Sequence, residues 1–455
     1  MRIAVVGAGW AGLAAAVQVT ESGHHATVFE ASRALGGRAR GALEKLPDGT
    51  QVMLDNGQHI LIGAYTETLR LMRLVGVNPD DTLLRLPLTL KFADATGLEF
   101  ADLPAPLDAL CGIWRVTGWS VRDKAALLLA AVTWRIRGFA CDPSLTVTQL
   151  CRGLTPRVMA GLIEPLCVSA LNTPADRASA QVFLRVMRDA VFGARGHSDL
   201  LLPRVDLSSL FPQAAARWME ENSAQVGGGQ VSLGHRMHLV YPDRRTGGWI
   251  LELETYDAVI LAVSSHEAVR ALSNMEARAP REIADEVAEW TGCARALPQE
   301  MIATVYAWGE GAALPRPMLA LRSSLDGSAP AQFAFDRGQL GGPLGLLAFV
   351  VSASQGERSA IEAAVLVQAR QQLGLTLQRV QTIVEKNATF ACTPGLRRPA
   401  TRISRNLYAC GDYIDGPYPA TLEGAVRSGV AAANAATHGR PRPRPDPERW
   451  QGHDD

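Results

Sequence analysis

The chain has 455 residues, more than one usual domain, and 47% of them are hydrophobic, so we expect two domains with large cores. Its 45 basic and 45 acidic residues balance, which argues against a nucleic acid as the main partner. The seven cysteines are scattered and lack any C-x-x-C spacing, so we expect free thiols, a cytoplasmic protein and no bound metal.

The first predicted elements are a strand, a glycine-rich turn and a helix, as in a dinucleotide-binding βαβ unit. An apolar strand over residues 3–6 is followed by three spaced glycines and an alanine-rich helix. In order, these glycines permit the tight turn, the approach of a pyrophosphate and the close packing of the helix. An acidic residue ends the next apolar strand, where its carboxylate can bind ribose hydroxyls. The unit predicts a nucleotide site comprising Gly7, Gly9, Trp10, Ala11, Gly12, Glu30 and Ala31.

A second glycine pair, Gly36 and Gly37, precedes Arg38. Glycines let the chain pass close to a pyrophosphate, and the guanidinium of Arg38 can donate hydrogen bonds to phosphate oxygens. A dehydrogenase that uses only a nicotinamide has no need of this segment. We therefore expect FAD as the cofactor, with a basic surface turn as the alternative interpretation.

Residues 86–205 are predicted to be mainly helical, and two stretches within them allow two interpretations. Residues 125–134 have no clear polar face, which is typical of a buried helix. Residues 107–119 contain two tryptophans beside arginines, a combination that suits the headgroup level of a membrane. Neither stretch reaches the ~20 apolar residues needed to span a bilayer. Two interpretations therefore stay open, core helices and helices that dock on a membrane surface.

Strand patterns return after residue 225. Residues 259–263 form a continuous apolar run, as for a parallel strand buried on both faces. A mixed lobe follows, with strands predicted over residues 301–308 and 344–352 and a helix over residues 359–373. Another strand ends at residue 410, and a further helix begins shortly after it.

This order of elements predicts an α/β fold (α+β overall) in which two domains interleave. A Rossmann-like FAD-binding domain would comprise residues 1–85, 206–268 and 391–439. A substrate-binding domain of mixed sheet and helices would comprise residues 86–205 and 269–390. We expect a disordered tail in the proline- and arginine-rich residues 440–455.

The motifs resemble those of the FAD-dependent amine oxidase and phytoene desaturase superfamily along essentially the whole chain. More narrowly, the chain resembles the hydroxysqualene dehydroxylases, the squalene-associated flavoproteins of bacterial squalene and hopanoid synthesis. The narrower resemblance rests on residues 55–65, 164–167 with 170–173, and 411–413 with 416–425.

The resemblance implies further contacts to FAD. It places two residues at one edge of the flavin ring and the backbone of residues 419–422 along the ring. It also places Met237 in a strand, with its backbone against adenine. The implied contacts are Gly57, Gln58, Met237, Gly411, Asp412, Pro419, Ala420, Thr421 and Leu422.

The resemblance also implies a reaction. A reduced flavin would deliver hydride to hydroxysqualene, the hydroxyl would leave as water, and squalene would be released. Protonation of the leaving oxygen calls for a general acid. His59 is the first candidate because imidazole titrates near neutrality, and a hydrogen-bonded structural histidine is the alternative. Asp55 and Tyr418 are further catalytic candidates, with roles in holding the loop and in packing as their alternatives.

Three other functions stay open. A carotenoid-type desaturase would run the redox chemistry in the opposite sense with the same fold. An amine oxidase is less favoured because no framing aromatic pair can be placed, and a prenyl-lipid carrier would not need the full set of cofactor motifs. The partners we expect are a long-chain isoprenoid, an unidentified electron donor and the inner face of the cell membrane, contacted peripherally.

Overall fold

A six-stranded sheet forms the nucleotide-binding part of the computed structural model, which describes residues 1–437 except 102, 104–106, 224–228, 238–239, 244, 277–278 and 325. The strand order is β10-β2-β1-β14-β21-β20, with only β20 antiparallel to its neighbour. The strands are β1 (Arg2–Val6), β2 (His25–Glu30), β10 (Gln230–Leu233), β14 (Ala258–Leu261), β20 (Arg402–Ser404) and β21 (Leu407–Ala409). The predicted Rossmann-like α/β fold is confirmed.

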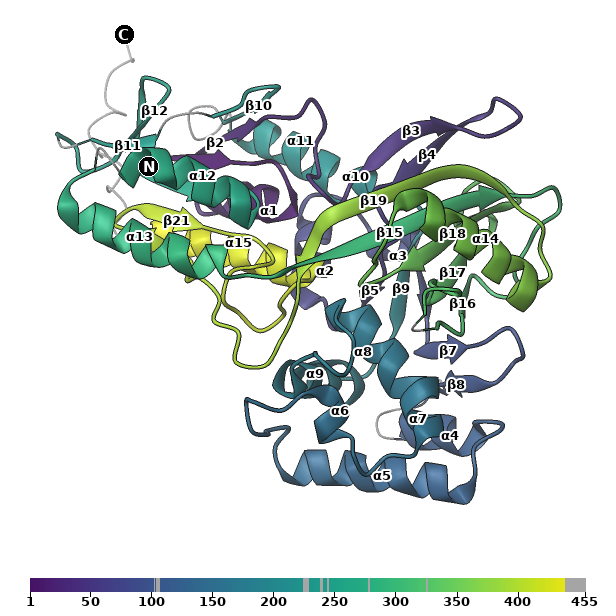
Figure 1. Cartoon of the computed structure of the whole chain (residues 1–455). Coiled ribbons are helices and arrows are strands. Elements are labelled where there is room, and N and C mark those ends of the chain that lie inside the picture. The colour runs from purple at the N-terminus through teal and green to yellow at the C-terminus, as the bar shows by residue number, and fades with distance from the viewer. Residues whose placement is uncertain are drawn as a thin grey trace, which may run out of the picture.

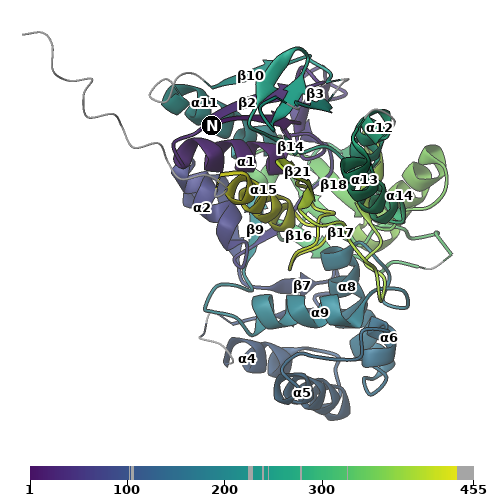
Figure 2. The same ribbon diagram turned by 90° about the vertical axis from the view of Figure 1, so that its left-hand side faces the viewer.

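Helices cover both sides of this sheet. In Figure 2, α1 (Trp10–Glu21) and α15 (Leu422–Thr437) lie to the left of β14 and β21, and α12 (Ser265–Glu276) and α13 (Arg281–Arg295) lie to the right. A Cβ on Gly429 of α15 would lie only 2.2 Å from the Ala11 carbonyl oxygen. The glycine therefore allows α15 and α1 to pack closely, which brings the last described helix onto the first.

The start of the predicted second domain lies elsewhere than expected. Helix α13, expected in the substrate domain, packs against β20 of the nucleotide-binding sheet instead. The indole Nε1 of Trp290 donates to the Ala400 carbonyl at 2.7 Å, and the Ser404 hydroxyl donates to Glu286. The chain enters the second domain only at β15.

The second domain contains a five-stranded antiparallel sheet in the order β16-β17-β18-β15-β19. Helix α14 (Arg358–Leu373) packs on one face of it (Figure 1). The helix and two of these strands occupy the positions predicted from the sequence. The strands are β15 (Gln299–Trp308), β16 (Met318–Ala320), β17 (Phe333–Asp336), β18 (Leu346–Val351) and β19 (Gln378–Phe390).

Further short strands and helices lie outside these two sheets. The short strands are β3 (Gly41–Lys45), β4 (Gln51–Asp55), β5 (Leu61–Ile62), β6 (Leu83–Leu86), β7 (Thr89–Lys91), β8 (Gly97–Glu99), β9 (Leu200–Pro203), β11 (Val240–Pro242), β12 (Trp249–Leu251) and β13 (Glu254–Tyr256). The helices are α2 (Thr66–Leu74), α3 (Pro79–Thr82), α10 (Leu207–Leu210) and α11 (Pro212–Ser223).

A helical lobe projects from the second domain (Figures 1 and 2). Its outermost members are α4 and α5, which contain the two stretches with open interpretations. Neither is a fully buried core helix, because each presents large apolar side chains to the outside. No helix in the described ranges is both long and apolar enough to cross a bilayer. The lobe contains α4 (Leu107–Arg115), α5 (Val121–Ile136), α6 (Val147–Leu150), α7 (Pro156–Val158), α8 (Glu164–Leu171) and α9 (Ala180–Val186).

All seven cysteines are free. No cluster of three or more potential metal ligands occurs among the residues the structure describes. The tail predicted over residues 440–455 lies outside those residues.

Candidate active site

A cavity of about 640 Å³ lies where the two domains meet. It extends from the carboxyl ends of β1 and β2 to the inner face of β15 and β18. Ligands of open α/β sheets bind at the carboxyl ends of the strands, and a volume of this size is typical of cofactor and substrate sites. The cavity is therefore the candidate active site.

The glycine turn after β1 forms one end of the cavity. Gly7 has a φ of +112°, and a Cβ there would lie 2.4 Å from the Ala262 carbonyl oxygen. A Cβ on Gly12 would lie 1.9 Å from the Gly7 carbonyl oxygen, so the start of α1 fits against the turn only with glycine. These two positions therefore shape the turn itself.

Gly9 differs from these two because no protein atom requires it to be glycine. A Cβ there would meet its nearest neighbour, Gly37, at an ordinary 3.9 Å. Both glycines line the cavity, so an added methyl group would fill space that is open to a ligand. The two glycine segments pair with each other and leave their cavity side open, which fits a pyrophosphate held there by backbone N–H groups.

Glu30 holds the turn in place while facing the cavity. Its two carboxylate oxygens accept hydrogen bonds from the backbone N–H groups of Ala8 and Ser32, each at 2.7 Å. Each oxygen keeps a second lone pair for a ligand hydroxyl. The carboxylate is thus fixed where a ribose would need it.

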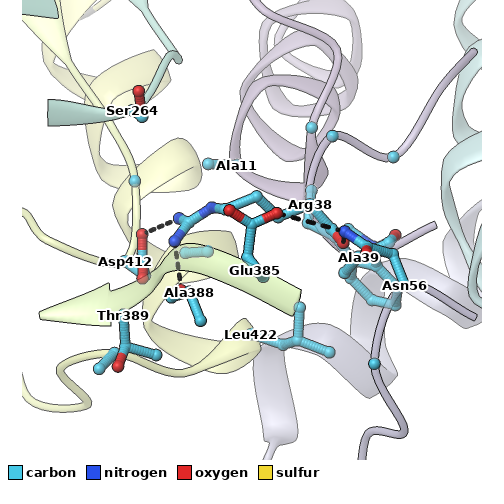
Figure 3. Close-up of a pocket in the computed structure, with 18 of the residues that line it drawn as sticks. Ala11, Arg38, Ala39, Asn56, Ser264, Glu385, Ala388, Thr389, Asp412 and Leu422 are labelled. Carbon is cyan, nitrogen blue, oxygen red and sulfur yellow. Dashed lines mark hydrogen bonds and ion pairs between the residues drawn. The ribbon is translucent and has the colours of Figure 1, made fainter. Parts of the chain in front are cut away.

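Arg38 connects three distant segments at the cavity wall (Figure 3). Its Nη2 lies 2.5 Å from Asp412 Oδ1, and its Nη1 donates to the carbonyls of Ala388 at 2.5 Å and Asn387 at 3.1 Å. The neighbouring Asp412 carboxylate raises the pKa of Arg38. Two residues predicted separately to contact FAD therefore form an ion pair with each other.

The C-terminal motif forms the adjoining wall. The Ser428 hydroxyl bonds to both the N–H and the carbonyl of Gly411, at 2.8 and 2.9 Å. Ala420 adopts a φ of +58°, and its N–H donates to the Asp412 carbonyl at 3.1 Å. This fold of the backbone points the amino end of α15, which carries positive partial charge, toward the cavity.

Most predicted cofactor residues line the cavity, and Gly12 and Pro419 do not. Gly12 acts from behind the turn, as described above. Met237 lines the cavity but does not lie in a strand, because β10 already ends at Leu233. The residues on the wall are Gly7, Gly9, Trp10, Ala11, Glu30, Ala31, Gly36, Gly37, Arg38, Gly57, Gln58, Met237, Gly411, Asp412, Ala420, Thr421 and Leu422.

His59 lines the cavity, but its environment does not suit an acid. Its Nδ1 lies 2.8 Å from the Gly57 carbonyl, which can only accept, so Nδ1 carries the proton. Burial lowers the pKa of His59 below 6.5, and the nearby Arg38 adds to the effect. The neutral ring has no proton on Nε2 at pH 7. His59 is therefore placed to accept a hydrogen bond there, which fits the alternative of a hydrogen-bonded structural histidine.

Asp55 and Tyr418, the other two catalytic candidates, are not among the residues that line the cavity. The Asp55 carboxylate accepts the backbone N–H of Leu207 at 2.8 Å. The Tyr418 hydroxyl donates to Asp189 at 3.0 Å, and the Arg427 guanidinium lies over its ring. Both side chains join segments of the fold, which fits the roles in holding the loop and in packing that the sequence left open.

Strand β15 contributes a residue that the sequence analysis missed. Thr304 lines the cavity, is 1% exposed, and its hydroxyl has no hydrogen-bond partner among the described residues. Along the strand, Ala303 and Val305 pack toward α14, while Ile302 and Thr304 face the cavity. The alternation of the strand could have identified Thr304 from the sequence, because a polar side chain on the inner face of a buried strand needs a hydrogen-bond partner.

Thr304 shares the cavity with several apolar side chains. Phe333 and Phe335 of β17 line the cavity with Ile302, Val350 and Ile383. The cavity thus has a polar end at the glycine turn and a predominantly apolar wall at the five-stranded sheet.

The same architecture occurs in a known protein family. A family model described as flavin containing amine oxidoreductase matches residues 10–437. The chain belongs to this family. FAD is accordingly the cofactor of this flavin containing amine oxidoreductase, and the residues around the glycine turn, Glu30 and Arg38 are arranged to hold it.

Several proteins are similar along most of the chain. The hydroxysqualene dehydroxylase of Rhodopseudomonas palustris is 28% identical, covering 94% of this chain and 97% of that protein. The enzyme of the same name from Zymomonas mobilis is 24% identical, covering 95% and 98%. A zeta-carotene desaturase of Zea mays is 28% identical, but the alignment covers only 33% of this chain and 26% of the desaturase. An oxidoreductase structure from Methanosarcina mazei, 14% identical, has the same fold with a TM-score of 0.71, covering 96% and 100%.

The buried Asp55 carboxyl predicts an unusual pH dependence of stability. Burial raises its pKa from 3.8 to about 6, so its contribution to stability is full below pH 3.8 and is lost as the pH rises through 6. Asp55→Asn keeps an oxygen for Leu207 and removes the charge. Relative to the unsubstituted protein, we expect the variant to gain up to about 3 kcal/mol between pH 4 and pH 8. Urea unfolding at the two pH values measures this gain, and a difference that does not change with pH would contradict it.

Proposed function

We propose that the protein is a reductive dehydroxylase that converts hydroxysqualene to squalene with bound FAD. The observation that carries this proposal is the extent of similarity to the curated enzymes. The two hydroxysqualene dehydroxylases align over 94–95% of the chain, whereas the zeta-carotene desaturase aligns over 33%. Full-length similarity includes the substrate domain, which is the part of a flavoenzyme that selects what is reduced.

The shape and polarity of the cavity support an isoprenoid substrate. The phenyl rings of Phe333 and Phe335 and the side chains around them form a wall that is suited to a hydrocarbon chain. The same side chains exclude water, which would otherwise capture an allylic cation. When bound, reduced FAD supplies the hydride of such a reaction.

We assign to Thr304 the role of binding the substrate hydroxyl. Its hydroxyl is buried and has no protein partner in the described ranges, and the residue lines the cavity. It can therefore hydrogen-bond the single polar group of a substrate that is otherwise a hydrocarbon. It lies beside Gly57, whose added Cβ would be 3.8 Å from the Thr304 oxygen. The hydroxyl of the substrate would thus be held next to the segment that the resemblance places at the flavin edge.

Thr304→Val tests this assignment because valine matches the shape of threonine and lacks the hydroxyl. We expect turnover efficiency to fall about tenfold, the value of one hydrogen bond. Flavin content and the unfolding midpoint should stay unchanged, since the hydroxyl has no protein partner to lose. Thr304→Ser is the matched control and should retain most activity. Equal rates for the valine variant and the parent protein would remove Thr304 from this role.

The reaction itself is tested directly with the holoprotein. Dithionite-reduced protein is incubated anaerobically with hydroxysqualene, and the extract is analysed for squalene. Formation of squalene with reoxidation of the flavin is the expected result. Absence of squalene while the flavin is demonstrably reduced would defeat the proposal. Conversion of phytoene by the oxidised protein, tested separately, would instead favour a desaturase.

A further inference from the structure

Helix α5 presents an apolar stripe to the outside of the molecule. Its inward face is formed by Asp123, Leu127 and Trp134, which are buried. At 100° per residue, the opposite face is apolar throughout, the reverse of an ordinary surface helix. This outward stripe consists of Val121, Ala125, Leu129, Val132 and Ile136, all exposed.

Helix α4 adds a second stripe beside the first. Leu107, Leu110 and Trp114 are spaced three and four residues apart and are exposed, Trp114 by 75%. The two helices are linked at Lys124, whose Nζ donates to the Trp114 carbonyl at 2.6 Å and lies over its indole ring. Seven of the fourteen exposed large apolar side chains in the described part of the chain lie on these two helices. We call the two stripes together the α4–α5 face.

Within residues 107–137, the segment that forms the α4–α5 face, the charges at the surface have one sign. Residues 107–137 contain two acidic residues, Asp108 and Asp123, and both are buried. The Asp123 carboxylate accepts hydrogen bonds from Ser120 and Thr155, so it is occupied inside the lobe. The basic residues of the same segment lie at the surface or partly so and flank the stripes. They are Arg115, Arg122, Lys124, Arg135 and Arg137.

We propose that the α4–α5 face docks on a bilayer that contains anionic lipids. An in-plane helix with an apolar face and basic flanks buries its apolar side chains at the headgroup boundary, while its basic groups attract anionic headgroups. Trp114 beside Lys124 and Arg115 suits the same interface, because an indole prefers the level between headgroups and acyl chains. The proposal rests on this surface alone and does not depend on the reaction assigned to the cavity.

A second copy of this chain is the competing occupant of the face. Two copies joined at this face would bring ten basic groups together, five from each, with no exposed acid of residues 107–137 to offset them. Like charges placed together disfavour such a pairing, whereas an anionic membrane complements them. The face also lies at the far tip of the helical lobe, away from the nucleotide-binding sheet (Figures 1 and 2). Docking there leaves the rest of the molecule free of the bilayer.

Vesicle binding by the full-length holoprotein tests the proposal. We expect co-sedimentation with vesicles of equimolar phosphatidylcholine and phosphatidylglycerol and much weaker binding to phosphatidylcholine alone. Leu129→Asp should weaken binding at least about tenfold, since one buried leucine side chain is lost from the interface. Arg122→Gln combined with Arg135→Gln should weaken it by roughly 25-fold and reduce its dependence on salt.

Val367→Asp is the matched control, because Val367 is also an exposed apolar residue on a helix, α14, outside this face. It should bind vesicles as the parent protein does. Flavin content measured for every variant shows that the fold is retained. The proposal fails if the parent does not bind anionic vesicles or if Leu129→Asp binds equally well. A concentration-dependent dimer that Leu129→Asp abolishes, seen by sedimentation velocity without vesicles, would overturn it in favour of a second copy.

Discussion

Replacing Gly12 with alanine is expected to deprive the protein of its flavin. The added Cβ would lie 1.9 Å from the Gly7 carbonyl oxygen and 2.9 Å from the Ala262 side chain, so α1 must move away from the turn. Backbone N–H groups that are displaced in this way no longer converge on a pyrophosphate. We expect the ratio of bound flavin to protein, measured from the visible absorbance, to fall at least about tenfold.

Gly292 provides the matched control for this substitution. It lies within α13, and a Cβ there would meet no atom within 4 Å. Gly292→Ala should therefore keep its flavin and even gain up to about 1 kcal/mol in stability, because alanine is the better helix former. A Gly12→Ala protein that purifies with full flavin would show that the turn tolerates the displacement.

Replacing Glu423 with alanine is expected to cause the largest loss of stability. Its carboxylate is fully buried and accepts hydrogen bonds from the N–H groups of Glu67 and Thr68 at 3.0 and 2.9 Å. It also accepts from the Thr68 hydroxyl at 2.7 Å and pairs with Arg427 at 2.7 Å. Alanine leaves all of these donors without their acceptor. We expect the free energy of unfolding to fall by about 3–5 kcal/mol in a denaturant titration.

The exposed pair between Arg2 and Glu254 is the comparison for this result. Both of its side chains are more than half exposed, so Glu254→Ala should change the free energy of unfolding by no more than about 1 kcal/mol. Glu423→Gln should lie between the two, since one acceptor oxygen remains. If Glu423→Ala were as stable as Glu254→Ala, α15 would not be anchored to α2 through this carboxylate.

The parts of the site that depend on local sequence were predictable. The need for glycine at position 12 follows from sterics with Gly7, five residues earlier, and the carboxylate of Glu30 follows from the length of one βαβ unit. The close contact of Gly7 is with Ala262, far away in the sequence. The resemblance also predicts a contact between Asp412 and FAD, and Asp412 lines the cavity. Neither the local motifs nor the resemblance predicts that Asp412 pairs with Arg38.

The side-chain directions set by tertiary contacts were not predictable. Asp55 and Tyr418 lie near cavity residues in the sequence. In the fold their side chains instead hydrogen-bond to Leu207 and Asp189, which belong to other elements, and do not line the cavity. The environment of His59 was not predictable for a related reason, because burial, which lowers its pKa, depends on the assembled fold. A sequence pattern shows which residues are close along the chain and cannot show which distant group binds each one.

The α5 helix illustrates a different limit. Residues 125–134 have no clear polar face, a pattern that is typical of a buried helix and does not show whether one side of the helix is exposed. Only the position of Leu127 and Trp134 against the lobe shows which side faces inward. The structure thereby identifies the outward stripe as the surface that needs an explanation.

The interleaved sheet has a consequence for how the protein is synthesised. Strand β14 lies between β1, near the start of the chain, and β21, which leaves the ribosome more than a hundred residues after β14. Until β21 is translated, β14 is an open edge made of Ala258, Val259, Ile260 and Leu261, a segment with no charge to prevent pairing with another chain. The nascent protein is therefore expected to need protection by chaperones during that interval, and overproduction without them should favour inclusion bodies.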